Sequence, residues 1–127
     1  MRPLIHPSIE DITLEGILHV LSDPVRAAIY AELAVADGAT SCSSFLQVRD
    51  RLIPKSTLSQ HFRALREAGL VRSERSGVEM HNATRCQEIE RRFPGLIQSI
   101  MKAYSLETAE RARGAKRKAA ARKTRSA

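Results

Sequence analysis

Residues 55–71 of this 127-residue chain, Lys-Ser-Thr-Leu-Ser-Gln-His-Phe-Arg-Ala-Leu-Arg-Glu-Ala-Gly-Leu-Val, have the pattern of a helix with two unlike faces. Leu58, Phe62 and Leu65 recur at i, i+4 and i+7, the spacing of a buried helical stripe. We expect Ser56 to cap this helix and Gly69 to end it. The opposite face carries hydroxyls, an amide and a guanidinium, which are groups that bind base edges and phosphates. An ordinary amphipathic surface helix has the same pattern, so the flanking segments must decide between the two.

Two helices are expected before this segment, because apolar residues recur at helical spacing. The first covers about residues 13–21. Asp23 is a good N-cap for the second, and Pro24 suits its first position, where no N–H is needed. We expect this second helix to close at Asp37-Gly38, with Arg26 facing water. Its inward residues would be Val25, Ala28, Ile29 and Leu33.

A third, short helix is expected immediately before Pro54, which prevents its continuation. Its inward residues would be Phe45, Val48 and Leu52. A short helix, a turn and a helix with a polar face form the helix-turn-helix arrangement. The segments before residues 55–71 therefore favour a recognition helix over an ordinary surface helix.

A β-hairpin is expected after Gly69. Residues 70–75 and 78–84 are two short runs on either side of a glycine-containing turn. A hairpin directly behind a recognition helix would be a wing, and its Arg72 and Arg75 would approach phosphates. Solvated surface charge is the alternative for each arginine.

The chain ends with an apolar helix and a basic tail. Apolar residues recur at helical spacing from near Cys86 to Tyr104, interrupted at Phe93-Pro94-Gly95. This stripe needs a partner surface, either the body of the same chain or a second subunit. Residues 111–127 hold eight of the 21 Lys and Arg residues and no acid, so the formal charge of +7 belongs to this tail.

We therefore divide the chain into an N-terminal arm (1–12), a winged helix-turn-helix domain with a C-terminal dimerisation helix (13–110) and a basic, disordered tail (111–127). The tail would add salt-sensitive, non-specific DNA affinity. A solubilising extension without a binding role is the alternative.

Two motifs resemble a known family. Leu21-Ser-Asp-Pro-Val-Arg-Ala-Ala-Ile29 resembles the opening of ArsR-type winged helix-turn-helix repressors, and residues 56–71 resemble their recognition helix and its exit into the wing. The resemblance covers about residues 13–105. It implies a mainly α fold with a small β-hairpin, a homodimer joined by the first and last helices, and repression at a pseudo-palindromic operator in double-stranded DNA. An inducer releases the DNA in most of the family.

We assign expected contacts on this basis. Gln60 suits adenine, and Arg63 suits guanine or phosphate. His61 lies at the edge of the apolar face, so it either packs under the helix or donates to a phosphate. The expected DNA contacts are Lys55, Ser56, Thr57, Ser59, Gln60, His61, Arg63, Arg72 and Arg75. The expected dimer contacts are Leu14, Ile17, Leu18, Leu96, Ile97, Ile100, Met101 and Tyr104.

The sequence departs from the metal-sensing branches of the family. Where those branches carry a Cys-x-Cys pair, this chain has only Cys42, and residues 93–110 contain no His or Cys. Three or four converging ligands are needed for a thiolate or imidazole site, so we expect no metal and no cofactor. Cys42 and Cys86 are a possible redox pair. Inert thiols are the alternative, because nothing in the sequence brings the two together.

Other functional classes lack sequence support. The chain has no Gly-rich phosphate loop, paired carboxylates or nucleophile elbow, so we do not expect an enzyme. It has no signal peptide and no apolar run long enough to cross a bilayer, so we expect a soluble, cytoplasmic protein. A winged-helix module for protein–protein interaction is the remaining alternative, because fold alone does not settle function. The inducer is not identified by the sequence.

Overall fold

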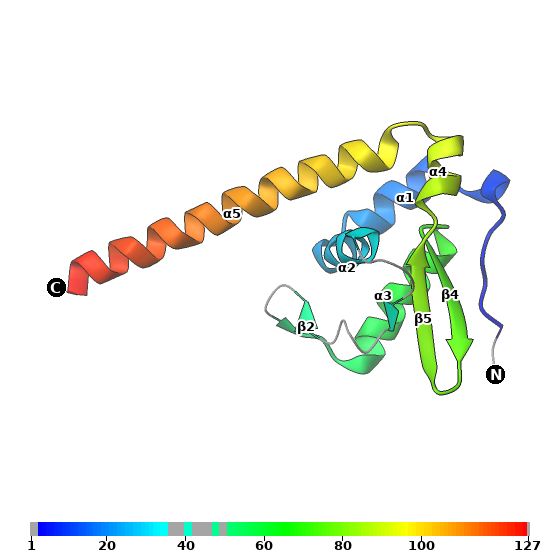
Figure 1. Cartoon of the computed structure of the whole chain (residues 1–127), viewed down its shortest axis with the longest axis horizontal. Coiled ribbons are helices and arrows are strands. Elements are labelled where there is room, and N and C mark those ends of the chain that lie inside the picture. The colour runs from blue at the N-terminus through cyan, green and yellow to red at the C-terminus, as the bar shows by residue number, and fades with distance from the viewer. Residues whose placement is uncertain (1–2, 36–39, 42–46, 49–50, 127) are drawn as a thin grey trace. The chain divides into compact units, whose positions relative to one another are not determined.

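The structure, a computed structural model, describes residues 3–35, 40–41, 47–48 and 51–126 (Figure 1). The chain forms two compact units, Met1–Pro94 and Gly95–Ala127. The second unit holds one helix, α5 (Leu96–Ser126). The elements of the first unit are η1 (Ile9–Asp11), α1 (Leu14–Leu21), α2 (Pro24–Val35), β1 (Thr40–Ser41), β2 (Gln47–Val48), β3 (Arg51–Leu52), α3 (Lys55–Glu67), β4 (Val71–Ser76), β5 (Glu79–Thr84) and α4 (Cys86–Arg92).

Side-chain caps start the first two helices, and the cap of the second, Asp23, is the one that the sequence predicts. The Thr13 hydroxyl accepts the Gly16 N–H at 3.0 Å at the start of α1. Asp23 Oδ1 accepts the N–H groups of Val25 at 2.8 Å and Arg26 at 3.3 Å, which satisfies donors that the first turn of α2 leaves unpaired. The expected end of the second helix at Asp37-Gly38 lies outside the described residues.

Of the two predicted ends of α3, the start is wrong and the end is confirmed. Ser56 does not cap the helix: Pro54 occupies the N-cap position and forms no side-chain cap bond. The other end is as predicted, because Gly69 takes a φ of 84°. The N–H groups of Gly69 and Leu70 donate to the carbonyls of Arg66 and Leu65, each at 3.0 Å, and so pair two of the last carbonyls of α3.

The expected third helix is wrong wherever this segment is described. Strands β2 and β3 form an antiparallel pair, with Gln47 opposite Leu52 and Val48 opposite Arg51. Leu52 was expected to point inward, but it is 82% exposed. Pro54 disfavours helical backbone at the residue before it, which keeps the chain extended as it enters α3. Phe45 lies outside the described residues.

The predicted wing is confirmed. Strands β4 and β5 are antiparallel from Val71 opposite Thr84 to Ser76 opposite Glu79, and Gly77 supplies the positive φ of the turn. The sequence did not indicate β1, which pairs with β5 and gives the sheet the order β1-β5-β4.

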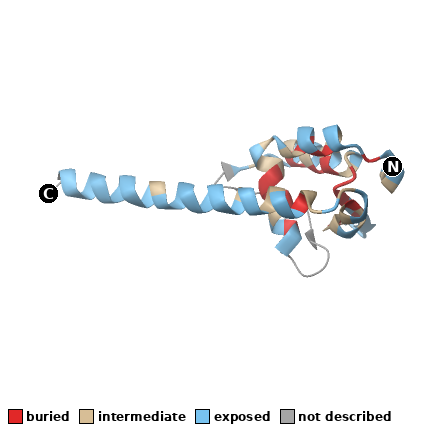
Figure 2. Cartoon of the chain, turned by 90° about the horizontal axis from the view of Figure 1, so that it is seen from above, coloured by how far each residue is buried: buried red, intermediate tan, exposed pale blue. Residues whose placement is uncertain are grey.

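The core of the first unit is aliphatic, with Tyr30 and Phe62 as its large aromatic members. Buried residues, red in Figure 2, include members of all four helices α1–α4 and of β4. The predicted stripe of α3 is confirmed, because Leu58, Phe62 and Leu65 are at most 3% exposed.

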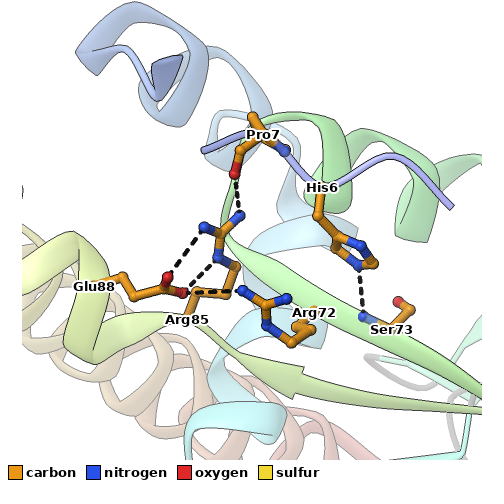
Figure 3. Close-up of polar contacts among 6 residues, drawn as sticks. All are labelled: His6, Pro7, Arg72, Ser73, Arg85 and Glu88. Carbon is orange, nitrogen blue, oxygen red and sulfur yellow. Dashed lines mark hydrogen bonds and ion pairs between the residues drawn. The ribbon is translucent and has the colours of Figure 1, made fainter. Parts of the chain in front are cut away.

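Hydrogen bonds of His6, Pro7 and Ile12 join the described part of the N-terminal arm to the rest of the first unit (the first two in Figure 3). His6 Nε2 accepts the Ser73 N–H at 3.0 Å, and the Pro7 carbonyl accepts from Arg85 Nη1 at 2.8 Å. The Ile12 carbonyl accepts from Arg92 Nε at 3.2 Å, and the Ile12 side chain is buried. The arm is therefore an ordered part of the unit from residue 3 onward.

The expected disorder of residues 111–127 is wrong up to Ser126, because α5 continues through this segment. Ala, Lys and Arg dominate the segment and are among the strongest helix formers. An ion pair of Arg111 Nη2 with Glu107 Oε1, at 2.6 Å and i,i+4 spacing, adds to helix stability. Across the described residues, no helix combines the length and apolar character needed to span a membrane.

Candidate nucleic-acid interface

Helix α3 presents a polar face opposite its buried stripe. Five of the expected DNA-contacting residues on this helix are exposed, and the other two, Thr57 and His61, are half-buried. Pro54 leaves the first N–H groups of α3 without a side-chain acceptor, and a helix N-terminus of this kind favours phosphate. The exposed residues are Lys55, Ser56, Ser59, Gln60 and Arg63.

Arg63 is paired within its own helix. Its Nε lies 3.0 Å from Glu67 Oε1, and the two side chains are 61% and 48% exposed. An exposed i,i+4 pair is worth only about 0.2–0.5 kcal/mol. Arg63 can therefore exchange Glu67 for a base or phosphate at little cost.

His61 is held by a residue that we expected to face water. Arg26, on α2, is half-buried and donates from Nε to His61 Nδ1 at 3.1 Å. A guanidinium only donates, so Nδ1 is the unprotonated nitrogen and the imidazole proton is on Nε2. The expected solvent-facing position of Arg26 is wrong because His61 offers it an acceptor. The predicted position of His61 at the edge of the apolar face is confirmed.

A chain of polar contacts connects α3 to both wing strands. Arg66 Nη1 donates to Ser73 Oγ at 3.4 Å, and Ser73 Oγ donates to Asn82 Oδ1. Ser73 and Asn82 are both buried, so these bonds replace water that burial removes. The sequence did not indicate a role for Arg66, Ser73 or Asn82. Most residues of β4 and β5 are polar, so nothing in the sequence distinguished Ser73 and Asn82 from their neighbours.

The two wing arginines differ in their surroundings. Arg72 is 48% exposed, and its Nη2 lies 3.6 Å from Glu88 Oε2 (Figure 3). Arg75 is exposed close to the turn of the hairpin. Arg75 lies nearer the tip of the wing than Arg72, and both side chains are exposed.

Arg85 is a buried charge that joins the arm to α4. Its Nε donates to Glu88 Oε2 at 2.6 Å and its Nη2 to Glu88 Oε1 at 3.3 Å, while Nη1 bonds the Pro7 carbonyl (Figure 3). The hydrogen bond from Arg85 is the main cause that lowers the pKa of Glu88. Burial, and then the charges of Arg72, Arg85 and Arg66, lower the pKa of His6 below 6.5. The neutral imidazole can therefore accept the Ser73 N–H.

The expected dimer residues on α1 fall into two groups. Ile17 is fully buried in the single chain, so it supports the core. Leu14 and Leu18 are 41% and 48% exposed, one helical turn apart. On α5, Leu96, Ile100, Met101 and Tyr104 are half-buried and Ile97 is buried.

The described residues include only one of the two cysteines and form no metal site. Cys86 is the first residue of α4 and is a half-buried free thiol, whereas Cys42 lies outside the described residues. The redox pair therefore stays a prediction. Within the described ranges, no three His, Cys, Asp or Glu side chains are grouped as a metal site would require.

Comparisons with known proteins match this architecture. A family model for a helix-turn-helix domain matches residues 21–74. The uncharacterized HTH-type transcriptional regulator YceK of Bacillus subtilis (strain 168) is 32% identical over 85 residues, which cover 66% of this chain and 82% of that protein.

Two solved structures have a similar fold. The ArsR-like transcriptional regulator from Rhodococcus sp. RHA1 is 26% identical, with a TM-score of 0.51, over 82% of this chain and 90% of that chain. An ArsR family transcriptional regulator at 21% identity, with a TM-score of 0.53, covers 76% of this chain and 92% of that chain. At that identity the second likeness concerns the fold alone.

Proposed function

The chain belongs to the ArsR-type helix-turn-helix transcriptional regulators, and from this premise we propose that it is a dimeric repressor that binds a pseudo-palindromic operator and leaves it when an inducer binds. Its family and fold are those of regulators, not of enzymes. Because the proposed binding partner is chromosomal DNA, we place its action in the cytoplasm.

The observation that carries this proposal is the exposed polar face of α3. Gln60 and Arg63 lie on that face at i and i+3, one turn apart and clear of the buried stripe. Gln suits the N6 and N7 edge of adenine, and Arg suits O6 and N7 of guanine, with about 1–3 kcal/mol of discrimination for each bidentate pair. The wing of the same chain leaves this face exposed, and its exposure and spacing in the dimer are what distinguish DNA binding from a protein-interaction module.

The remaining contacts position the helix without specifying sequence. Lys55 and Ser59 lie beside the N-terminus of α3, which favours phosphate. The proton on His61 Nε2 is available to a phosphate oxygen, because Arg26 donates to the other ring nitrogen. Arg75 adds a phosphate contact from the wing. The exposed basic residues of α5 beyond residue 110 add salt-sensitive, non-specific affinity.

Dimer formation would use the outer face of the first helix and the apolar stripe of the last. The exposed Leu14 and Leu18 support this proposal, because a partner surface would cover them. Two-fold symmetry would place two recognition helices in successive major grooves, about one helical turn apart.

Selection of binding sites from random double-stranded DNA tests the proposal, with sedimentation of the protein–DNA complex to count chains. We expect one enriched sequence with two inverted half-sites about one turn apart, bound by two chains. Failure to enrich any sequence, or a single bound chain on a single half-site, would reject the proposal.

A further inference from the structure

A cavity of about 300 Å³ lies where the N-terminal arm, α3 and the wing meet. This volume is at the lower end of those that hold small ligands. The lining residues are Pro3, Leu4 and Ile5 from the arm, Arg63, Arg66 and Glu67 from α3, and Arg75 and Met80 from the wing.

The lining combines apolar and cationic groups. Leu4, Ile5 and Met80 supply hydrocarbon and thioether surface, and three guanidiniums face it with a single carboxylate. That carboxylate, Glu67, is paired with Arg63, so the cavity keeps a net positive charge. Arginine binds carboxylate and related anions bidentately and tolerates partial burial better than lysine.

The neighbourhood of the cavity also carries positive charge. His6 directly follows the arm residues of the lining, and its pKa is lowered first by burial and then by Arg72, Arg85 and Arg66, with only Glu74 acting in the opposite direction. The arginine charges that disfavour a protonated imidazole at His6 would attract an anion to the same place. A bound anion would reduce that repulsion.

Hydrogen bonds hold the walls of the cavity in place. The arm is joined to β4 through His6 and the Ser73 N–H, and to Arg85 through the Pro7 carbonyl (Figure 3). The guanidinium of Arg66 bonds Ser73 Oγ from the α3 side. A site whose walls are already ordered loses little entropy when a ligand enters.

We propose that this cavity binds a small organic acid, with its carboxylate among Arg63, Arg66 and Arg75 and its hydrocarbon tail against Leu4, Ile5 and Met80. An inorganic anion would leave the apolar side without a partner. A neutral hydrocarbon would gain no charge-assisted hydrogen bond from the guanidiniums. Both parts of the ligand are therefore needed.

Occupancy of the cavity is coupled to DNA binding, and this part rests on the proposed function. Arg63 and Arg75 line the cavity and are also proposed DNA contacts. A bound carboxylate neutralises part of their charge and orients them away from the groove. The acid therefore acts as an inducer that competes with the operator.

The test uses the full chain without DNA and three probes: octanoate, acetate, which lacks the tail, and octan-1-ol, which lacks the charge. Equilibrium dialysis should give saturable binding of one octanoate per chain. Acetate and octan-1-ol should bind at least about tenfold more weakly, because each loses either the apolar or the charge-assisted contacts.

Variants locate the site. Arg75→Gln on the exposed wing and Ile5→Asp at a side chain that is 61% exposed should each weaken octanoate binding by about tenfold. Neither change removes a core residue, so both proteins should fold. Arg91→Gln, at an exposed arginine of α4 outside the lining, should leave binding unchanged.

Absence of saturable octanoate binding, or equal binding in Ile5→Asp and wild type, would overturn the site. Addition of octanoate to the operator complex tests the coupling separately. Release of DNA supports it, and unchanged affinity for DNA at saturating octanoate refutes it. A chain that binds octanoate but no DNA sequence would refute the proposed function and leave the acid site standing.

Discussion

Arg26 on α2 donates its Nε proton to Nδ1 of His61 on α3 across 3.1 Å, although 35 residues separate the two in sequence. This bond joins α2, which begins at the Asp23 cap and Pro24, to α3, whose polar face carries the proposed function. It also leaves the second imidazole nitrogen as a donor. The orientation of His61 is therefore set from α2.

A double-mutant cycle with Arg26→Ala and His61→Ala measures this contact. We expect each single change to lower the free energy of unfolding and the two effects to be non-additive by about 1 kcal/mol, the usual net value of such a hydrogen bond. Urea unfolding of the four proteins gives the coupling. Strict additivity would show that the contact contributes nothing to stability.

Gly69→Ala should be among the most destabilising changes in the chain. The residue has a φ of 84°, and a Cβ there would overlap the side chain of buried Ile12. Gly77→Ala is the matched control, because Gly77 has a φ of 63° with nothing near its missing Cβ. We expect a cost of about 1–2 kcal/mol at Gly77 from the left-handed backbone alone, and clearly more at Gly69. Equal midpoints of thermal unfolding would show that Ile12 moves aside freely.

Features that depend on residues close together in the chain could be predicted from the sequence, and features that depend on distant residues could not. The Asp23 cap, the stripe of α3 and the Gly69 terminus depend on neighbours within a few residues, and the structure confirms them. The opposite edge of the sheet, β1, was missed because its two residues acquire strand geometry only by pairing with β5.

The sequence was least informative where a residue bonds a partner far away in the chain. It also misled where helix propensity alone keeps a segment helical. His6 bonds a residue 67 positions away and Pro7 one 78 positions away, so the arm carries no local signal of its order. Arg26 looked solvated because its acceptor lies on another helix. The tail was taken as disordered because it has no apolar stripe, yet its Ala, Lys and Arg content favours helix without one.

Acidification should release the arm at His6. The folded-state pKa of His6 is lowered below 6.5, so its contribution to stability is present above 6.5 and is lost as the pH falls through the folded-state value. We compare urea unfolding of wild type and His6→Ala between about pH 8 and about pH 5. Wild type should be more stable by about 1 kcal/mol at the upper pH and lose this advantage at the lower. A difference that does not change with pH would contradict the proposed role of neutral His6.

Removal of the Arg63 ion pair should strengthen DNA binding. Glu67→Gln eliminates the carboxylate that Arg63 contacts, and we expect operator affinity to rise about twofold to fivefold, the range of an exposed pair. Glu32→Gln is the control: it changes net charge equally, at an exposed glutamate of α2 that lies outside α3 and outside the basic segment of α5. Equal increases in fluorescence anisotropy titrations of the two variants would assign the effect to net charge and reject the specific role of Arg63.

The central claim is that the exposed face of α3 recognises DNA sequence, and Gln60→Ala tests it most directly. Anisotropy titrations compare wild type, Gln60→Ala and Gln87→Ala, the last at an exposed glutamine of α4 outside that face. On the selected operator we expect Gln60→Ala to lose at least about fivefold in affinity, with its affinity for random DNA unchanged and with Gln87→Ala equal to wild type. Wild-type operator affinity in Gln60→Ala, or an equal loss on random DNA, would contradict recognition by this face.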